Sequence, residues 1–324
     1  MIMFLCFVKN CHRLRPLRLS VFSIGYLMLS MGSACGQAAA APNQDPPPKT
    51  FVDSTPEANE LASRLRAERI AFQRTRFHSF ALYDFKLDGV ACKIACPKTA
   101  AEGSPWVWRA RFWGHQPQLD LALLEKGWHV GYCDVQDLLG ADPALERWDA
   151  FYAFTQRLKL HSRPLLEGMS RGGLIVMRWA SAHPERVCGI YVDNGVMDIR
   201  SWPGGKGASQ GAPRVWQDAL KAYDLTEQQA AAFMDGPLDR LEPLAKAGVP
   251  ILALINEADT VVPPAENGDL LVARYRELGG RITEKRRAGL GHHPHSLKNP
   301  APLVAFALES LERADKSVTQ NQTK

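Results

Sequence analysis

A serine, an aspartate and a histidine, which together could carry out nucleophilic hydrolysis, follow one another in that order along this chain. Ser170 stands in the stretch "GMSRG" (residues 168–172), which matches the pattern G-x-S-x-G. Asp259 follows in "NEADTVVPP", and His292 follows in "GLGHHPH". A serine hydroxyl is a weak nucleophile at neutral pH, so it needs a histidine as base and a carboxylate that orients the histidine. The order serine, acid, histidine is typical of a serine held on a sharp turn between a strand and a helix.

The segments around these residues predict the strands and turns that this chemistry requires. The apolar residues 164–168 predict a strand and residues 172–183 a helix, so Ser170 falls at the turn between them. Residues 250–256 predict a buried strand just before Asp259, and residues 281–289 a strand before His292. Because parallel strands end at one edge of a sheet, we expect the three side chains to meet there.

The rest of the chain predicts an α/β fold with a mostly parallel central sheet and helices on both faces. Residues 80–98 predict a hairpin that turns at 87–89 and adds antiparallel strands at one edge. Residues 196–245, rich in Gly and Pro in their first part, predict an insertion after the strand that follows the serine helix, acting as a lid. Further helices are predicted at 57–73, 116–128, 143–158, 268–280 and 302–314, and further strands at 129–135 and 187–195.

The N-terminal residues predict export from the cytoplasm. Four basic residues precede the apolar run 19–32, and small residues follow it, which is the order of a secretory signal peptide. We therefore expect a signal peptide at 1–36, with Cys35 as a candidate lipid attachment site, and a periplasmic or extracellular protein. A flexible Pro/Ala-rich linker is predicted at 37–55, a catalytic domain at 56–316 and a disordered tail at 317–324.

The charge balance argues against a nucleic-acid partner. The whole chain carries a formal net charge of +5, but residues 1–36 hold four Lys or Arg and no Asp or Glu. The remainder carries 35 basic residues against 34 acidic ones, so it offers no strong field to a polyanion. We also expect no membrane span in the exported chain, since the only long apolar run lies in the predicted leader.

The motifs around Ser170, Asp259 and His292 resemble those of the α/β-hydrolase superfamily, over about residues 80–314. The arginine after the serine resembles the G-x-S-R-x-G motif of glucuronoyl esterases and related bacterial carbohydrate esterases. The chain is also similar to the catalytic domain of prolyl-oligopeptidase-type peptidases. The resemblance implies a carboxylesterase that forms an acyl-enzyme on Ser170 and cleaves an ester of a carbohydrate or other small substrate. A serine peptidase and a non-catalytic binding protein on the same scaffold are the alternatives.

Several residues compete for the acid and base roles. Asp193 and Asp198 follow the apolar run "GIYV" (residues 189–192) of a predicted strand and are alternatives to Asp259. His293 is the alternative base beside His292. His295 is expected to support the site rather than to enter it. We expect no metal site and no cofactor, because neighbouring histidines on one loop seldom converge and no distant Cys/His cluster completes a set.

The remaining predictions concern the oxyanion and the substrate. The backbone N–H of Arg171 is the expected first oxyanion donor, since the turn itself supplies that group. The stretch "GSPWVWRARFWGH" (residues 103–115) is expected to supply the second donor, from one of residues 106–109, with Trp108 preferred. Trp106, Arg109 and Trp202 are predicted to contact substrate. The Arg171 side chain either pairs with a nearby carboxylate or, as the glucuronoyl esterase resemblance implies, faces the oxyanion or an acidic sugar.

Overall fold

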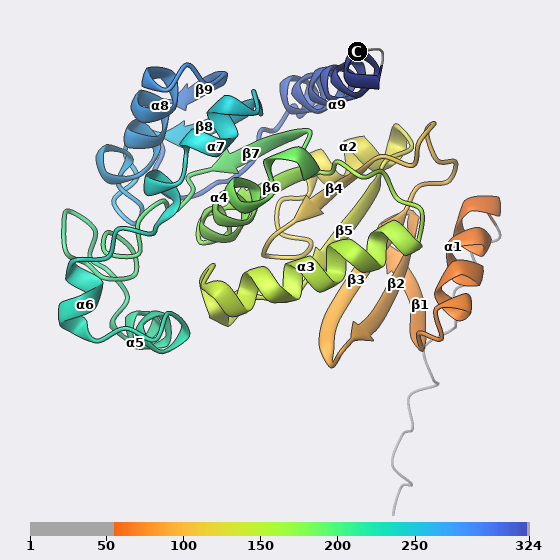
Figure 1. Cartoon of the computed structure of the whole chain (residues 1–324), viewed down its shortest axis with the longest axis horizontal. Coiled ribbons are helices and arrows are strands. Elements are labelled where there is room, and N and C mark those ends of the chain that lie inside the picture. The colour runs from red at the N-terminus through yellow and green to blue at the C-terminus, as the bar shows by residue number, and fades with distance from the viewer. Residues whose placement is uncertain (1–54, 323–324) are drawn as a thin grey trace, which may run out of the picture. The chain divides into compact units, whose positions relative to one another are not determined.

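The computed structural model describes residues 55–322, with side chains described up to residue 316. These residues form nine strands in one sheet, in the order β1-β2-β3-β5-β4-β6-β7-β8-β9 (Figure 1). The signal peptide and nearly all of the linker predicted at the N-terminus lie outside the described residues. None of the helices described here has both the length and the apolar character needed to cross a membrane.

The sheet has an antiparallel part and a parallel part. Strands β1, β2, β3 and β5 pair antiparallel in that order, and β5, β4, β6, β7, β8 and β9 pair parallel. The predicted turn at residues 87–89 is where β2 passes to β3. The strand bounds are β1 Phe72–Phe77, β2 Phe80–Leu87, β3 Val90–Cys96, β4 Trp106–Arg109, β5 His129–Cys133, β6 Leu165–Met169, β7 Gly189–Asp193, β8 Ile251–Asn256 and β9 Ile282–Arg287.

Helices cover both faces of this sheet, as the sequence predicts. Apolar side chains of α1, α3, α4, α7 and α8 share one buried cluster with one face. Those of α2 and α9 share a second cluster with the other face. The bounds are α1 Pro56–Ala67, α2 Gln118–Glu125, α3 Asp142–Arg157, α4 Gly172–Ala182, α5 Pro213–Ala222, α6 Glu227–Ala231, α7 Glu242–Lys246, α8 Gly268–Glu277 and α9 Ala301–Gln322. The predicted α/β architecture is confirmed.

The insertion at residues 196–245 follows β7 and carries α5, α6 and α7 (Figure 1). Its apolar side chains, among them Trp202 and Trp216, form a third buried cluster with Leu139, Leu174 and Val262. Leu139 and Val262 follow the ends of β5 and β8, and Leu174 lies in the first turn of α4. The insertion therefore packs over the edge where the parallel strands end. That is the edge at which Ser170 lies.

Three predictions along the chain were wrong. The helix predicted at residues 57–73 ends at Ala67, and its last two residues belong to β1, which was not predicted. Residues 106–109 were assigned to a loop but form β4, an inner strand with parallel neighbours on both sides. A strand buried on both faces reads as a short apolar run without alternation, so its signal is weak. The tail expected to be disordered from residue 317 continues α9 as far as Gln322. The sequence "SVTQNQ" contains no Gly or Pro that would end a helix there.

Candidate active site

Ser170 occupies the turn between β6 and α4 in a left-handed backbone conformation, with φ of +50°. That conformation costs a non-glycine residue on the order of 1–2 kcal/mol, so the surrounding structure must hold it. The Ser170 N–H donates to the carbonyl of Asp193 at 3.0 Å, and the Ser170 carbonyl accepts from Val196 at 2.9 Å. The two ends of the residue are thus tied to β7 and the segment after it.

Gly168 lets helix and strand approach closely at this turn. A Cβ on Gly168 would lie 2.6 Å from Cγ2 of Val176 and 2.9 Å from the carbonyl oxygen of Gly172. A Cβ on Gly172 would meet nothing closer than 3.4 Å, which is ordinary contact. The first glycine of the motif is therefore the one that the packing requires.

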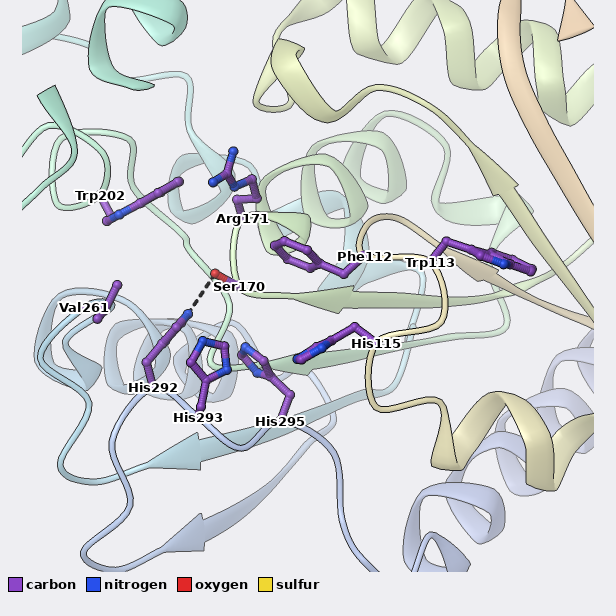
Figure 2. Close-up of a pocket in the computed structure, with 10 residues that line it drawn as sticks. All are labelled: Phe112, Trp113, His115, Ser170, Arg171, Trp202, Val261, His292, His293 and His295. Atoms are coloured by element: carbon purple, nitrogen blue, oxygen red, sulfur yellow. Dashed lines mark hydrogen bonds between the residues drawn. The ribbon is translucent and has the colours of Figure 1, made fainter. Parts of the chain in front are cut away.

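The side chains of Ser170, His292 and Asp259 form a hydrogen-bonded relay. Nδ1 of His292 lies 2.7 Å from Oδ2 of Asp259. Nε2 of His292 lies 2.9 Å from Oγ of Ser170, the bond drawn as a dashed line in Figure 2. Because a carboxylate can only accept, Nδ1 carries the proton, and Nε2 is left to accept from the serine hydroxyl. His292 rather than His293 reaches the serine.

Asp259 is buried and fixed by backbone donors. Its Oδ1 accepts from the N–H groups of Val261 and Val262, each at 2.9 Å, which leaves Oδ2 for His292. Charge-assisted bonds of this kind hold a carboxylate in one orientation. The turn after β8 therefore holds the Asp259 carboxylate in the orientation that it needs to bind His292.

The two alternative acids, Asp193 and Asp198, bind other side chains. Asp193 accepts from the Tyr191 hydroxyl at 2.6 Å and lies 3.1 Å from Nδ1 of His295. Asp198 is engaged by the guanidinium of Arg200. Neither carboxylate is bonded to His292, so the structure favours Asp259 over both.

Asparagines at the ends of β7 and β8 support the loop that carries His292. The Asn194 amide donates to the His292 carbonyl at 3.2 Å, and the Asn256 amide donates to the Gly291 carbonyl at 2.6 Å. Asn256 N–H in turn donates to the side chain of Asn194 at 2.8 Å. The histidine is thus positioned by the same sheet edge that positions the serine.

A pocket of about 430 Å³ opens beside Ser170. Its walls are mainly aromatic and imidazole rings, with one guanidinium (Figure 2). The lining residues are Phe112, Trp113, His115, Ser170, Arg171, Trp202, Val261, His292, His293 and His295. An apolar pocket with a few convergent polar groups is the usual form of a small-molecule site.

Arg171 lies against Trp202 at the pocket wall. Its guanidinium carbon is 4.9 Å from the centroid of the Trp202 ring, and it forms no ion pair with any residue that the structure describes. Burial, together with the nearby charge of Arg111, lowers the pKa of Arg171. Of the two roles left open for the Arg171 side chain, the structure therefore does not show the pairing with a carboxylate. Trp202, predicted to contact substrate, does line the pocket.

Trp106, Trp108 and Arg109 do not reach the pocket, so those predictions were wrong. All three belong to β4 and are almost completely buried. Trp108 is paired in register with β5 on one side and with β6 on the other, so its backbone N–H lies inside the sheet and does not face Ser170. The Arg109 guanidinium lies between Asp120 and Glu167, at 2.5 Å and 3.2 Å.

Free backbone donors instead lie just beyond β4. Ala110 N–H still bonds to the sheet, at Glu167, but the N–H groups of Arg111 and Phe112 donate to no residue within the described part of the chain. The same is true of the N–H of Arg171. A Cβ on Gly172 would lie 3.5 Å from Cβ of Arg111, so this segment runs along the first turn of α4.

Two more histidines line the pocket, of which the sequence pointed only to His293, as an alternative base. His115 was not considered, although it stands in the same stretch as Phe112 and Trp113. His293 is exposed on the pocket wall. Burial, then the neighbouring His295, lowers the pKa of both imidazoles. A lowered pKa favours the neutral form of both imidazoles at pH 7.

Comparisons with known proteins agree on the architecture. No protein-family model matches this chain, and no curated protein matches it either. Among solved structures, a mutant puromycin hydrolase complexed with PGG superposes with a TM-score of 0.57 at 16% identity, over 76% of this chain and 40% of its own. The fold is that of the α/β-hydrolases.

Two further structures superpose on the same fold. Dipeptidyl peptidase 4 of Porphyromonas gingivalis has a TM-score of 0.54 at 15% identity, over 75% of this chain and 35% of that one. Est1E from Butyrivibrio proteoclasticus has a TM-score of 0.52 at 19% identity, over 71% of this chain and 99% of that one. The chain thus spans 40% or less of the puromycin hydrolase and the dipeptidyl peptidase, but 99% of Est1E.

Proposed function

We propose that this chain is a serine hydrolase that cleaves carboxylic esters through an acyl-enzyme on Ser170. The observation that carries the proposal is the relay from Asp259 through His292 to Ser170 at the wall of an aromatic pocket. The α/β-hydrolase fold of the structural neighbours supports the same chemistry by analogy of scaffold.

In the first half of the reaction, Nε2 of His292 takes the proton from Ser170 as Oγ attacks the ester carbonyl. Asp259 holds the imidazole in the required tautomer and stabilises the imidazolium that forms. His292 then gives the proton to the leaving alcohol. In the second half, His292 removes a proton from water as the water attacks the acyl-enzyme, and returns that proton to Oγ of Ser170 as the acid is released.

The oxyanion that forms in each half needs donors that are already in place. The backbone N–H of Arg171 is the first, and we assign the second to the free N–H of Arg111 or Phe112 in place of the predicted Trp108. Each such donor contributes about 2.7–4 kcal/mol to stabilisation of the transition state. Their position at the start of α4 adds the positive end of the helix dipole.

We propose an ester of a carbohydrate, or another small ester of similar size, as the substrate. The pocket volume of about 430 Å³ suits a small group, and the rings of Phe112, Trp113 and Trp202 are suited to packing against a sugar face. Arg171, without a carboxylate partner among the described residues, suits an acidic or strongly polar substituent.

We further propose that the protein works outside the cytoplasm, in the periplasm or beyond it. The proposal rests on the order of basic, apolar and small residues in positions 1–36. N-terminal sequencing of the protein from fractionated cells tests it. A mature N-terminus near residue 37 supports export, and an intact Met1 in the cytoplasmic fraction contradicts it.

A substrate panel tests the proposed reaction. Purified wild type and Ser170→Ala are assayed on p-nitrophenyl acetate and butyrate, acetylated and methyl-esterified sugars, and aminoacyl p-nitroanilides. We expect the wild type to turn over esters and Ser170→Ala to fall to the background rate. Cleavage of peptide substrates alone would identify a peptidase, and sugar binding without any turnover would identify a binding protein.

A further inference from the structure

His295, in the pocket wall, forms with the buried Asp193 a second aspartate–histidine pair that the proposed reaction does not use. Nδ1 of His295 lies 3.1 Å from Oδ1 of Asp193, so this carboxylate fixes the ring as Asp259 fixes His292. His295 is only 2% exposed, yet its Nε2 has no hydrogen-bond partner among the described residues. A buried nitrogen with a free lone pair, held by a carboxylate on its other side, is incomplete without a ligand.

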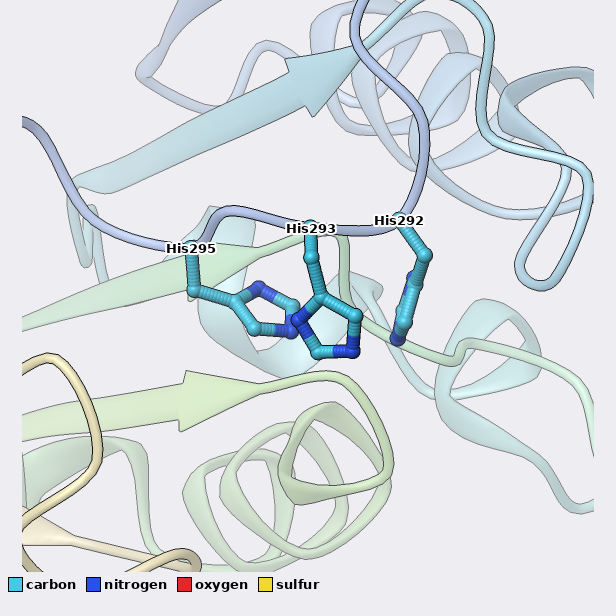
Figure 3. A group of neighbouring side chains, drawn as sticks. All are labelled: His292, His293 and His295. Atoms are coloured by element: carbon cyan, nitrogen blue, oxygen red, sulfur yellow. The ribbon is translucent and has the colours of Figure 1, made fainter.

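His295 lies in a group of three imidazoles whose nitrogens converge. The loop between β9 and α9 carries His292, His293 and His295, and Figure 3 shows the three rings gathered on one side of it. One ring nitrogen from each lies within 4.8 Å of the other two. The expectation that neighbouring histidines on one loop do not converge is therefore wrong here.

This spacing is close to what a zinc-like ion needs. Zn²⁺ binds imidazole nitrogen at about 2.0–2.1 Å in tetrahedral geometry, which places ligand nitrogens about 3.3 Å apart. Small rotations of the side chains close the remaining gap, and His293 is exposed and free to turn. His292 can offer only Nε2, because its Nδ1 is engaged by Asp259.

We propose that His292, His293 and His295 bind one divalent transition-metal ion of the Zn²⁺ type, and that this ion switches the serine off. Neutral imidazoles suit zinc, copper and nickel, and carboxylates on the far nitrogens of two ligands strengthen such sites. A tetrahedral ion would have one further position open towards the pocket, whose wall also carries His115.

The switch follows from competition for one nitrogen. Nε2 of His292 holds the Ser170 hydroxyl at 2.9 Å in the structure. When that nitrogen binds a metal ion it can no longer accept the serine proton, so the nucleophile loses its base. Metal binding itself does not depend on the proposed function, but the inhibition does.

Isothermal titration of tag-free protein with Zn²⁺ tests the binding. We expect one ion per chain in wild type, and an affinity at least about tenfold weaker in His293→Ala, which removes an exposed ligand. His78→Ala removes an exposed histidine outside the pocket and should bind as the wild type does. Asp193→Asn should weaken binding by about 10–100-fold, as loss of a carboxylate behind a ligand does.

Ser170→Ala separates this proposal from the proposed function. Because this variant has no hydroxyl on Nε2 of His292, it should bind Zn²⁺ at least as tightly as the wild type, whether or not the protein is an esterase.

Ester hydrolysis tests the inhibition. The rates of wild type and His78→Ala should fall at least about tenfold over the same Zn²⁺ titration and return when a chelator is added, while the rate of His293→Ala should change much less. Absence of binding to folded wild type, or equal binding by His293→Ala, would overturn the site. Binding without loss of hydrolysis would overturn the switch.

Discussion

Replacing Glu167 with glutamine should stabilise the protein at neutral pH, and the gain should grow as the pH rises. Glu167 lies in β6, three residues before Ser170, in a fully buried cluster where it shares the guanidinium of Arg109 with Asp120. Burial, and next the charge of Asp120, raises the pKa of Glu167 well above its usual range. Oδ1 of Asp120 and Oε2 of Glu167 have no partner among the described residues, and a proton on Glu167 that donates to Asp120 would satisfy both atoms.

The direction of the effect follows from proton linkage. A carboxyl group whose pKa is higher in the folded than in the unfolded state stabilises the fold fully below the unfolded pKa, about 4.3 for Glu. That contribution is lost as the pH rises towards the folded pKa. One proton changes the free energy of unfolding by about 1.4 kcal/mol per pH unit, so the wild type loses up to about 2.7 kcal/mol between about pH 5 and pH 7. Glutamine needs no proton, since its amide can accept from Arg109 and donate to Asp120.

Thermal unfolding followed by circular dichroism at about pH 5, 6 and 7 measures the effect. For a chain of this size about 2–4 °C corresponds to 1 kcal/mol, so the Tm difference between Glu167→Gln and wild type should widen by up to about 10 °C over this range. Glu277→Gln, the same change at an exposed position on α8, should follow the wild type at each pH. A difference that does not change with pH, or a Glu167→Gln protein that is less stable than wild type at pH 7, would refute the reasoning.

Three more changes test the site and its support. Asp259→Asn should lower kcat by about 10⁴-fold with the Tm little changed, because the imidazole loses its orienting carboxylate, and steady-state kinetics on an ester measures this. Gly168→Ala should lower the free energy of unfolding by about 1–3 kcal/mol, because its Cβ would overlap Val176. Gly172→Ala should have the stability of the wild type in the same denaturant titration. A titration in which Gly172→Ala is the less stable variant would contradict the packing argument. Trp202→Ala should raise KM more than it lowers kcat, because the ring lines the pocket without touching the relay, and an unchanged KM would remove Trp202 from the substrate site.

The sequence predicted the α/β architecture and the positions of the three relay residues because their signals are local. A glycine-flanked serine between an apolar run and a helix can be recognised within a few residues, and each partner follows a strand end in the same way. The structure brings these residues together as the order of strands along the sheet edge requires.

The residues that line the pocket were harder to predict because they depend on a register that only the packed sheet defines. A shift of the strand boundary moved Trp106 and Trp108 from the expected substrate loop into the core and left Phe112 and His115 at the pocket. Arg109 was expected to contact substrate, and only the fold reveals the two buried carboxyl groups that pair with its guanidinium.

Labelling of the serine by a fluorophosphonate, read as intact protein mass, tests the central claim most directly. The relay of Asp259, His292 and Ser170 predicts a single adduct on wild type, none on Ser170→Ala and much slower labelling of His292→Ala, with all three proteins shown to be folded by their Tm. An adduct on Ser170→Ala would mean that a different nucleophile reacts. No adduct on folded, chelator-treated wild type would mean that the geometry around Ser170 does not activate it.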